Sequence, residues 1–95
     1  METIDFSSRV TVPEQVIAKR LDDEMVILHL TSETYFGLNG MATAMWQELT
    51  TANSVEEAYD SLLGQYEVEP DALRSDMVDL LQQLVKMQIV ELSSA

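Results

Sequence analysis

The stretch VIAKRLDDEMVILHLTSETYFGLN, from Val16 to Asn39, decides the fold. It holds two apolar runs rich in β-branched residues, Val16 to Leu21 and Met25 to Leu30, which are separated by the acidic turn DDE. Two such runs joined by a short polar turn are typical of a β-hairpin. A second short turn leads into Thr34 to Leu38, so we expect a three-stranded antiparallel meander whose third strand lies at an edge of the sheet.

Helix-start signals follow the meander. Asn39 is a good N-cap, Ser54 and Glu57 have the spacing of a capping box, and Pro70 suits the first position of a helix. The expected helices run from Asn39 to about Thr51, from Ser54 to about Tyr66 and from Pro70 to about Met87. The sequence therefore predicts an α+β fold, a three-stranded antiparallel β-meander followed by three α-helices.

The residues before the meander show a different pattern. Apolar side chains fall on even positions at Ile4, Phe6, Val10 and Val12. A period of two indicates extended backbone, and Pro13 closes it. We expect residues 1–12 to form an N-terminal extended arm and residues 13–95 to form the domain proper. At the other end, Ile89 to Leu92 either returns to the sheet or docks on the domain.

The third predicted helix has an unusually wide apolar arc. At 100° per residue, its main stripe and the neighbouring valines and leucines cover about half of the circumference, whereas one core contact needs about 100°. The arc comprises Leu73, Met77, Val78, Leu80, Leu81, Leu84, Val85 and Met87, with Arg74 inside it. Two explanations stay open: the domain wraps the helix on two sides, with the arm over Val78 and Val85, or the helix borders an open groove that receives a partner.

The sequence of the third strand favours the second explanation, an open groove that receives a partner. An edge strand offers unpaired N–H and C=O groups, and proteins usually block such an edge with Lys, Pro or a bulge. Thr34 to Leu38 contains neither Lys nor Pro, although Gly37 leaves a bulge open as an alternative. An extended peptide could add here as a fourth strand, with alternate side chains in apolar pockets along the helix.

Length and charge exclude several classes of protein. The chain has 95 residues, 17 of them acidic and 5 basic, and a formal net charge of −12. This length suits a single domain. Nucleic-acid affinity rests mainly on Lys and Arg, so neither nucleic acid nor an anionic membrane surface is an expected partner. No apolar run reaches the length of a membrane span, and Glu2 and Asp5 stand where a signal peptide needs positive charge, so we expect a cytoplasmic protein.

Catalytic and metal-binding patterns are missing. There is no cysteine, and the one histidine, His29, is expected to be a partly exposed strand residue without a catalytic role. The acidic cluster Asp22-Asp23-Glu24 lacks the continuation of a calcium loop and is interpreted as a solvated turn. The sequence shows no phosphate-binding loop and no dinucleotide fingerprint. We expect a protein that is not an enzyme, with no metal and no cofactor.

Taken together, several segments between Val10 and Leu92 resemble the PqqD-like family. They are Val16 to Arg20, Met25 to Leu30, Tyr35 to Asn39, Trp46, Tyr66 to Pro70, Asp76 and Leu84. The most specific is Tyr35-Phe36-Gly37-Leu38-Asn39, followed seven residues later by Trp46. The resemblance implies a winged helix-turn-helix-like domain that serves as the recognition element for ribosomally made, post-translationally modified peptides (RiPPs) and binds the leader of a precursor.

The resemblance also implies where the leader binds. In such domains the leader lies antiparallel along the third strand, in a cleft shared with the third helix. Carried over to this sequence, the peptide-binding residues would be Thr34, Tyr35, Phe36, Gly37 and Leu38 on the strand and Arg74, Met77, Val78 and Leu81 on the helix. Leu38 shares a face with Phe36, so a purely core role for Leu38 stays open.

A free-standing domain of this kind resembles two family settings. The preferred one is the discrete recognition protein of lasso-peptide pathways, whose partners are the precursor leader and a separate leader peptidase of the cysteine protease type. The alternative is a chaperone that delivers a precursor to a radical-SAM enzyme. A winged-helix transcriptional regulator fits less well, because it needs a basic recognition helix and the third helix carries Asp71, Asp76 and Asp79 against Arg74 and Lys86.

Overall fold

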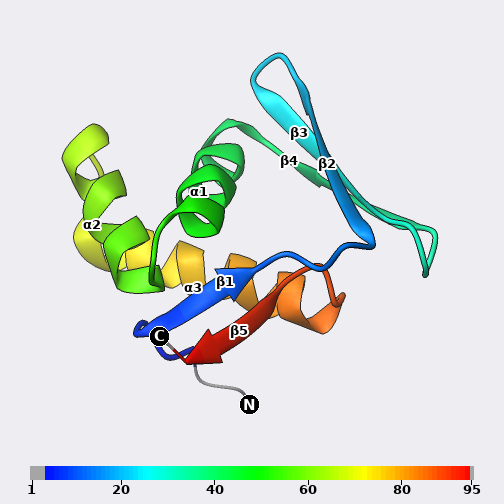
Figure 1. Ribbon diagram of the computed structural model, residues 1–95. Helices are drawn as coiled ribbons and strands as arrows, with labels where there is room; N and C mark the ends of the chain where they lie inside the picture. Colours follow the sequence, from blue (N-terminus) through cyan, green and yellow to red (C-terminus); the bar gives the residue numbers. More distant parts are fainter. Residues whose placement is uncertain (1–3, 95) are drawn as a thin grey trace.

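A computed structural model describes residues 4–94 of the chain and confirms the predicted α+β fold. The elements are β1 (Ser8–Thr11), β2 (Val16–Leu21), β3 (Glu24–His29), β4 (Thr34–Leu38), α1 (Gly40–Thr51), α2 (Val55–Gln65), α3 (Pro70–Lys86) and β5 (Glu91–Ser94) (Figure 1). The part of the expected arm before Ile4 lies outside the described residues.

Strands β2, β3 and β4 form the predicted antiparallel meander in that order. Ile27 at its centre is fully buried, with Ala18 opposite it on β2 and Phe36 opposite it on β4. The β2–β3 turn is shorter than expected, because Glu24 already pairs with Leu21. Asp22 takes the left-handed conformation in this turn with φ of 56°, which Asp tolerates better than most residues.

A second, two-stranded sheet joins the two ends of the described chain. β1 pairs antiparallel with β5, and Val10 stands opposite Leu92. The apolar residues Ile4, Phe6 and Val10 are all buried. The segment that returns after α3 therefore pairs with the N-terminal residues and not with the meander, and residues 4–11 contribute side chains to the core.

The capping residues act as the sequence predicts. The side-chain oxygen of Asn39 accepts a hydrogen bond of 3.1 Å from the backbone N–H of Ala42, and the Ser54 hydroxyl accepts one of 3.1 Å from that of Glu57. Pro70 occupies the start of α3. These bonds satisfy backbone donors that have no partner within the helix.

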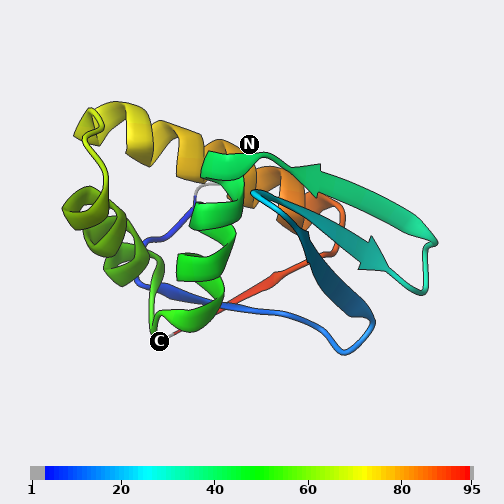
Figure 2. The ribbon, with the colours of Figure 1, turned by 90° about the horizontal axis from the view of Figure 1, so that it is seen from above.

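Helix α1 contacts both sheets. In Figure 2, α1 lies between α2 and the meander, while α3 runs across one side of both α1 and the meander. The largest fully buried side chains of the core are those of Ile27, Leu38, Leu49, Val55, Leu62, Leu73, Met77, Leu81, Leu84, Ile89 and Val90. None of the helices in the described part of the chain combines the length and apolarity that crossing a bilayer requires.

Candidate functional site

The outer edge of β4 is open. β4 pairs with β3 on one side, and within residues 4–94 no strand pairs with its other side (Figure 1). In an antiparallel sheet, alternate residues of such an edge direct their N–H and C=O groups away from the sheet. β4 therefore presents backbone donors and acceptors that another extended chain could pair with.

A cleft of about 330 Å³ adjoins this strand and is bounded by three elements. The strand side is formed by Phe36, Gly37, Leu38 and Asn39. The first half of α1 contributes Met41, Ala42 and Met45, and α3 contributes Asp76, Asp79, Leu80 and Gln83. The tight connection from β4 into α1, which is capped by Asn39, places the first turn of α1 beside the end of the strand.

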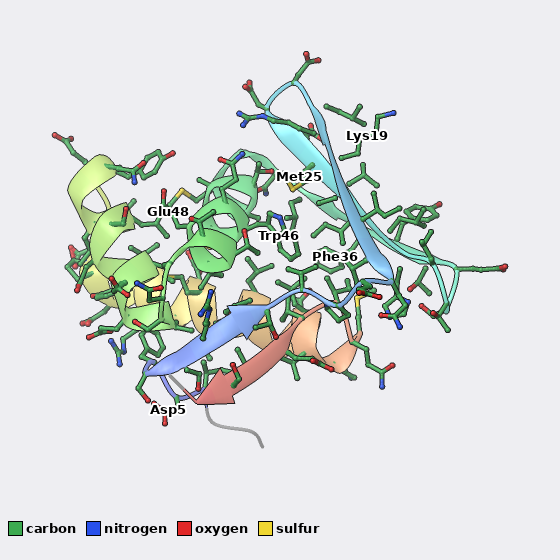
Figure 3. The ribbon with its side chains drawn as sticks, viewed as in Figure 1. Asp5, Lys19, Met25, Phe36, Trp46 and Glu48 are labelled. Atoms are coloured by element: carbon green, nitrogen blue, oxygen red, sulfur yellow. The ribbon has the colours of Figure 1, made fainter. Side chains whose placement is uncertain are left out.

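The two faces of β4 differ sharply. Leu38 is 2% exposed and Phe36 is half-buried, so these two residues face the helices. Figure 3 shows Phe36 on this inner side of the meander, together with Met25 and Trp46. Tyr35, in contrast, is 75% exposed on the outer face. Phe36 and Leu38 both pack in or against the core and line the cleft, and Phe36 is the more exposed of the two.

Of the predicted strand residues, Phe36, Gly37 and Leu38 line the cleft, whereas Thr34 and Tyr35 do not, and the predicted helix residues lie elsewhere. Met77 and Leu81 are fully buried in the core, and Val78 packs against the core half-buried. Arg74 lies over the Phe6 ring at 3.9 Å from the ring centroid, and its Nη1 is 3.7 Å from Oε2 of Glu56. None of these four residues lines the cleft, and Arg74 instead contacts Phe6 of the N-terminal segment.

Sequence reasoning missed the residues of α3 that do line the cleft. Asp76, Asp79, Leu80 and Gln83 follow a spacing of three, one and three residues and so lie on one helical face. The three polar members resemble an ordinary solvated face, and Leu80, at 8% exposed, resembles a core residue. The available signal was that Leu80 has polar neighbours on one side of the helix, Asp76 and Gln83, and apolar neighbours on the other, Met77 and Leu84, which marks it as a residue at the border of the core.

Charged groups on the cleft walls are all acidic. Asp76 and Asp79 line the cleft, and no Lys or Arg is among its lining residues. Within the described residues, no group of three His, Asp or Glu side chains is placed to hold a metal ion. The pKa of the Asp5 carboxyl is lowered by hydrogen bonds from the hydroxyl and the amide of Ser7, at the end of the molecule remote from the cleft (Figure 3).

His29 is buried, at 8% exposed, and not partly exposed as expected. It lies on the inner face of the meander, opposite Val16 and Thr34, and its Nδ1 accepts a hydrogen bond of 3.3 Å from the backbone N–H of Ser32. His29 lines a separate hollow of about 530 Å³ near β5, away from the β4 cleft. The His29 ring thus holds the β3–β4 turn through its hydrogen bond with Ser32.

The fold and the cleft define a small α+β domain with an open sheet edge beside a helix. Residues 24–90 match the family described as Coenzyme PQQ synthesis protein D (PqqD). The chain belongs to this family, which confirms the resemblance drawn from the sequence. No curated protein sequence matches the chain.

Two solved structures share the fold. TbiB1 in complex with the TbiA(beta) leader peptide is 31% identical, with a TM-score of 0.78 over 85% of this chain and 94% of that one. Lasso peptide synthetase B1 complexed with the leader peptide is 24% identical, with a TM-score of 0.77 over 87% of this chain and 98% of that one. The second likeness is informative about the fold alone.

Proposed function

We propose that this protein is a non-catalytic leader-peptide-binding protein of RiPP biosynthesis, in the lasso-peptide setting. The observation that carries the proposal is the open edge of β4 bordering a cleft between β4, α1 and α3. The same fold occurs in TbiB1, which was solved in complex with a leader peptide at 31% identity to this chain. The leader adds to the meander as a fourth strand, antiparallel to β4.

The cleft supplies both kinds of contact that strand addition needs. Backbone groups of Thr34 to Leu38 pair with the leader backbone and contribute affinity largely independent of sequence. Successive side chains of a strand point to opposite faces, so every second leader side chain points toward α3. There it meets an apolar surface made by Phe36, Met41, Met45 and Leu80. The helix part of the proposed site is therefore Asp76, Asp79, Leu80 and Gln83, in place of the four residues taken from the resemblance.

The cost of ordering the leader limits the affinity of this kind of binding. Ordering a flexible leader costs several kcal/mol, which offsets part of the gain from pairing and apolar burial. We expect dissociation constants from micromolar to tens of nanomolar. That range suits a protein that captures a precursor and later releases it.

In this proposal the chemistry belongs to partners. The protein holds the precursor beside a separate leader peptidase of the cysteine protease type and raises its local concentration there. It works in the cytoplasm, and it needs no cofactor. A chaperone that serves a radical-SAM enzyme would use the same cleft, and the PqqD family match favours keeping that alternative. The partner enzyme distinguishes the two settings.

The experiment is titration of the full chain with synthetic leader peptides, followed by calorimetry. The probes are the TbiA(beta) leader and the N-terminal parts of any short precursors encoded beside the gene, each with a scrambled peptide as its control. We expect saturable binding to at least one leader and hydrogen-exchange protection of Thr34 to Leu38 in the complex. Saturable binding without protection of β4 would contradict strand addition, and binding to none of the leaders would contradict the function.

A further inference from the structure

The charges on the exposed face of α3 change sign along the helix. Asp76 and Asp79 line the cleft beside β4. A second hollow of about 260 Å³ follows it, lined by Asp79, Gln82, Gln83 and Lys86. The two hollows are adjacent along α3, since Asp79 and Gln83 line both, and together they are called the groove. Its α3 wall is acidic at the start of the groove and basic at the end.

These charges are not neutralised by the rest of the described chain. The ion pair found among residues 4–94 joins Arg74 to Glu56 and involves none of the groove residues. The walls that face α3 across the cleft are uncharged, since β4, Asn39 and α1 present only apolar, glycine and amide groups there. An oppositely charged side chain on a guest would therefore meet an unpaired carboxylate, in a site that the guest itself partly shields from water.

The direction of the guest strand decides the order in which it meets the charges. Figures 1 and 2 both show β4 and α3 running in roughly opposite directions. A strand antiparallel to β4 therefore runs along α3 in the same sense as the helix. Its earlier residues lie beside Asp76 and Asp79, and its later residues lie beside Lys86.

The two periodicities set the spacing. From the midpoint of Asp76 and Asp79 to Lys86, an α-helix rises about 13 Å. A strand covers that distance in about four residues. Because four is an even number, the guest side chain beside Asp76 and Asp79 and the one beside Lys86 both lie on the strand face that points toward α3.

We propose that the groove selects leaders with a defined order of charge, a Lys or Arg opposite Asp76 and Asp79 and, about four residues closer to the C-terminus, an Asp or Glu opposite Lys86. The proposal rests on the strand addition proposed above and adds the feature that chooses among guests. The formal net charge of −12 on the protein also favours the approach of a basic peptide.

The experiment is selection of binders from a display library of random linear peptides. One arm uses the unaltered chain and a second uses the charge-swapped variant Asp76→Lys/Asp79→Lys. Both positions are exposed, so circular dichroism should show an unchanged fold. The matched control is Asp60→Lys/Glu67→Lys, which makes the same charge change at exposed positions outside the groove.

We expect the unaltered chain and the control to enrich a basic residue followed about four positions later by an acidic one. The charge-swapped variant should enrich an acidic residue at the first position. For one selected peptide, replacing its basic residue with Glu should weaken binding to the unaltered chain about tenfold, and the charge-swapped variant should restore it.

Selected peptides that protect β4 from exchange but show no charge preference would overturn this inference and leave the proposed function standing. The same holds if the preference is identical for the unaltered and charge-swapped chains. Failure to select any peptide that protects β4 would instead overturn the proposed function, and this inference with it.

Discussion

The guanidinium carbon of Arg74 lies 3.9 Å from the centroid of the Phe6 ring and so joins α3 to the segment that precedes β1. Tyr59 of α2 completes the cluster, with its ring edge-on to Phe6 at a centroid distance of 6.0 Å. This cluster covers the flank of α3 opposite the cleft. It separates a structural side of the helix, which includes Arg74, Met77 and Leu81, from the side that faces the open edge of β4.

Replacing Phe6 with Ala should lower the free energy of unfolding by about 3 kcal/mol, since it removes a buried ring and the surface on which Arg74 stacks. Urea denaturation measures the change. The milder variant Phe6→Leu should retain much of the stability. A Phe6→Ala protein as stable as the unaltered chain would show that the N-terminal segment does not contribute to the core in solution.

Replacing Arg74 with Gln should leave leader affinity within about twofold, because its side chain contacts Phe6 and Glu56 and does not line the cleft. Calorimetric titration with a leader that binds the unaltered chain tests this. A large loss of affinity would mean that the guest reaches the structural flank of α3, as the sequence-based site assumes.

Leu80 and Leu81 are adjacent on α3 but should respond differently. Leu81→Ala should cost about 2–5 kcal/mol of stability because Leu81 is fully buried, whereas leader affinity of the folded fraction should change little. Leu80→Ser should also lower stability, because Leu80 is 8% exposed, but it should in addition weaken leader binding by the folded fraction, because Leu80 lines the cleft. Denaturation and titration of both variants separate the two effects, and a reversed pattern would place the cleft on the other face of the helix.

Strand addition predicts an alternating response to backbone N-methylation of the leader. An added methyl group removes an N–H donor and crowds the sheet edge. Only every second residue of the guest pairs with β4, so methylation should abolish binding at alternate positions and be tolerated between them. A series of singly methylated peptides, titrated in turn, gives the pattern. Uniform tolerance would mean that side chains alone hold the guest.

Asn39→Ala should lower stability by about 1 kcal/mol, because the N–H of Ala42 loses its side-chain acceptor at the start of α1. Asn39→Asp keeps an acceptor at the cap and should lose less. Thermal unfolding of the two variants gives the comparison. Equal losses would show that the cap does not stabilise α1.

The meander and the three helices could be predicted from the sequence because their signals are local. Alternation of apolar and polar residues, and capping side chains such as Asn39 and Ser54, act within a few residues of where they stand. The open edge of β4 was also predictable, since Thr34 to Leu38 carries none of the blocking residues and no further strand follows it directly. Of these strand residues, Phe36, Gly37 and Leu38 line the cleft.

The choice between the two flanks of α3 required the tertiary structure. A wide apolar arc shows only that apolar side chains occupy about half of the helix surface. Local periodicity does not say which neighbouring element packs on which side of the helix. The answer depends on the pairing of Val10 with Leu92, between segments at opposite ends of the chain. That pairing brings the N-terminal segment against Arg74 and leaves Asp76, Asp79, Leu80 and Gln83 to face the cleft. Local chemistry thus determined the elements and the open strand, and a long-range contact decided which helix face stands beside it.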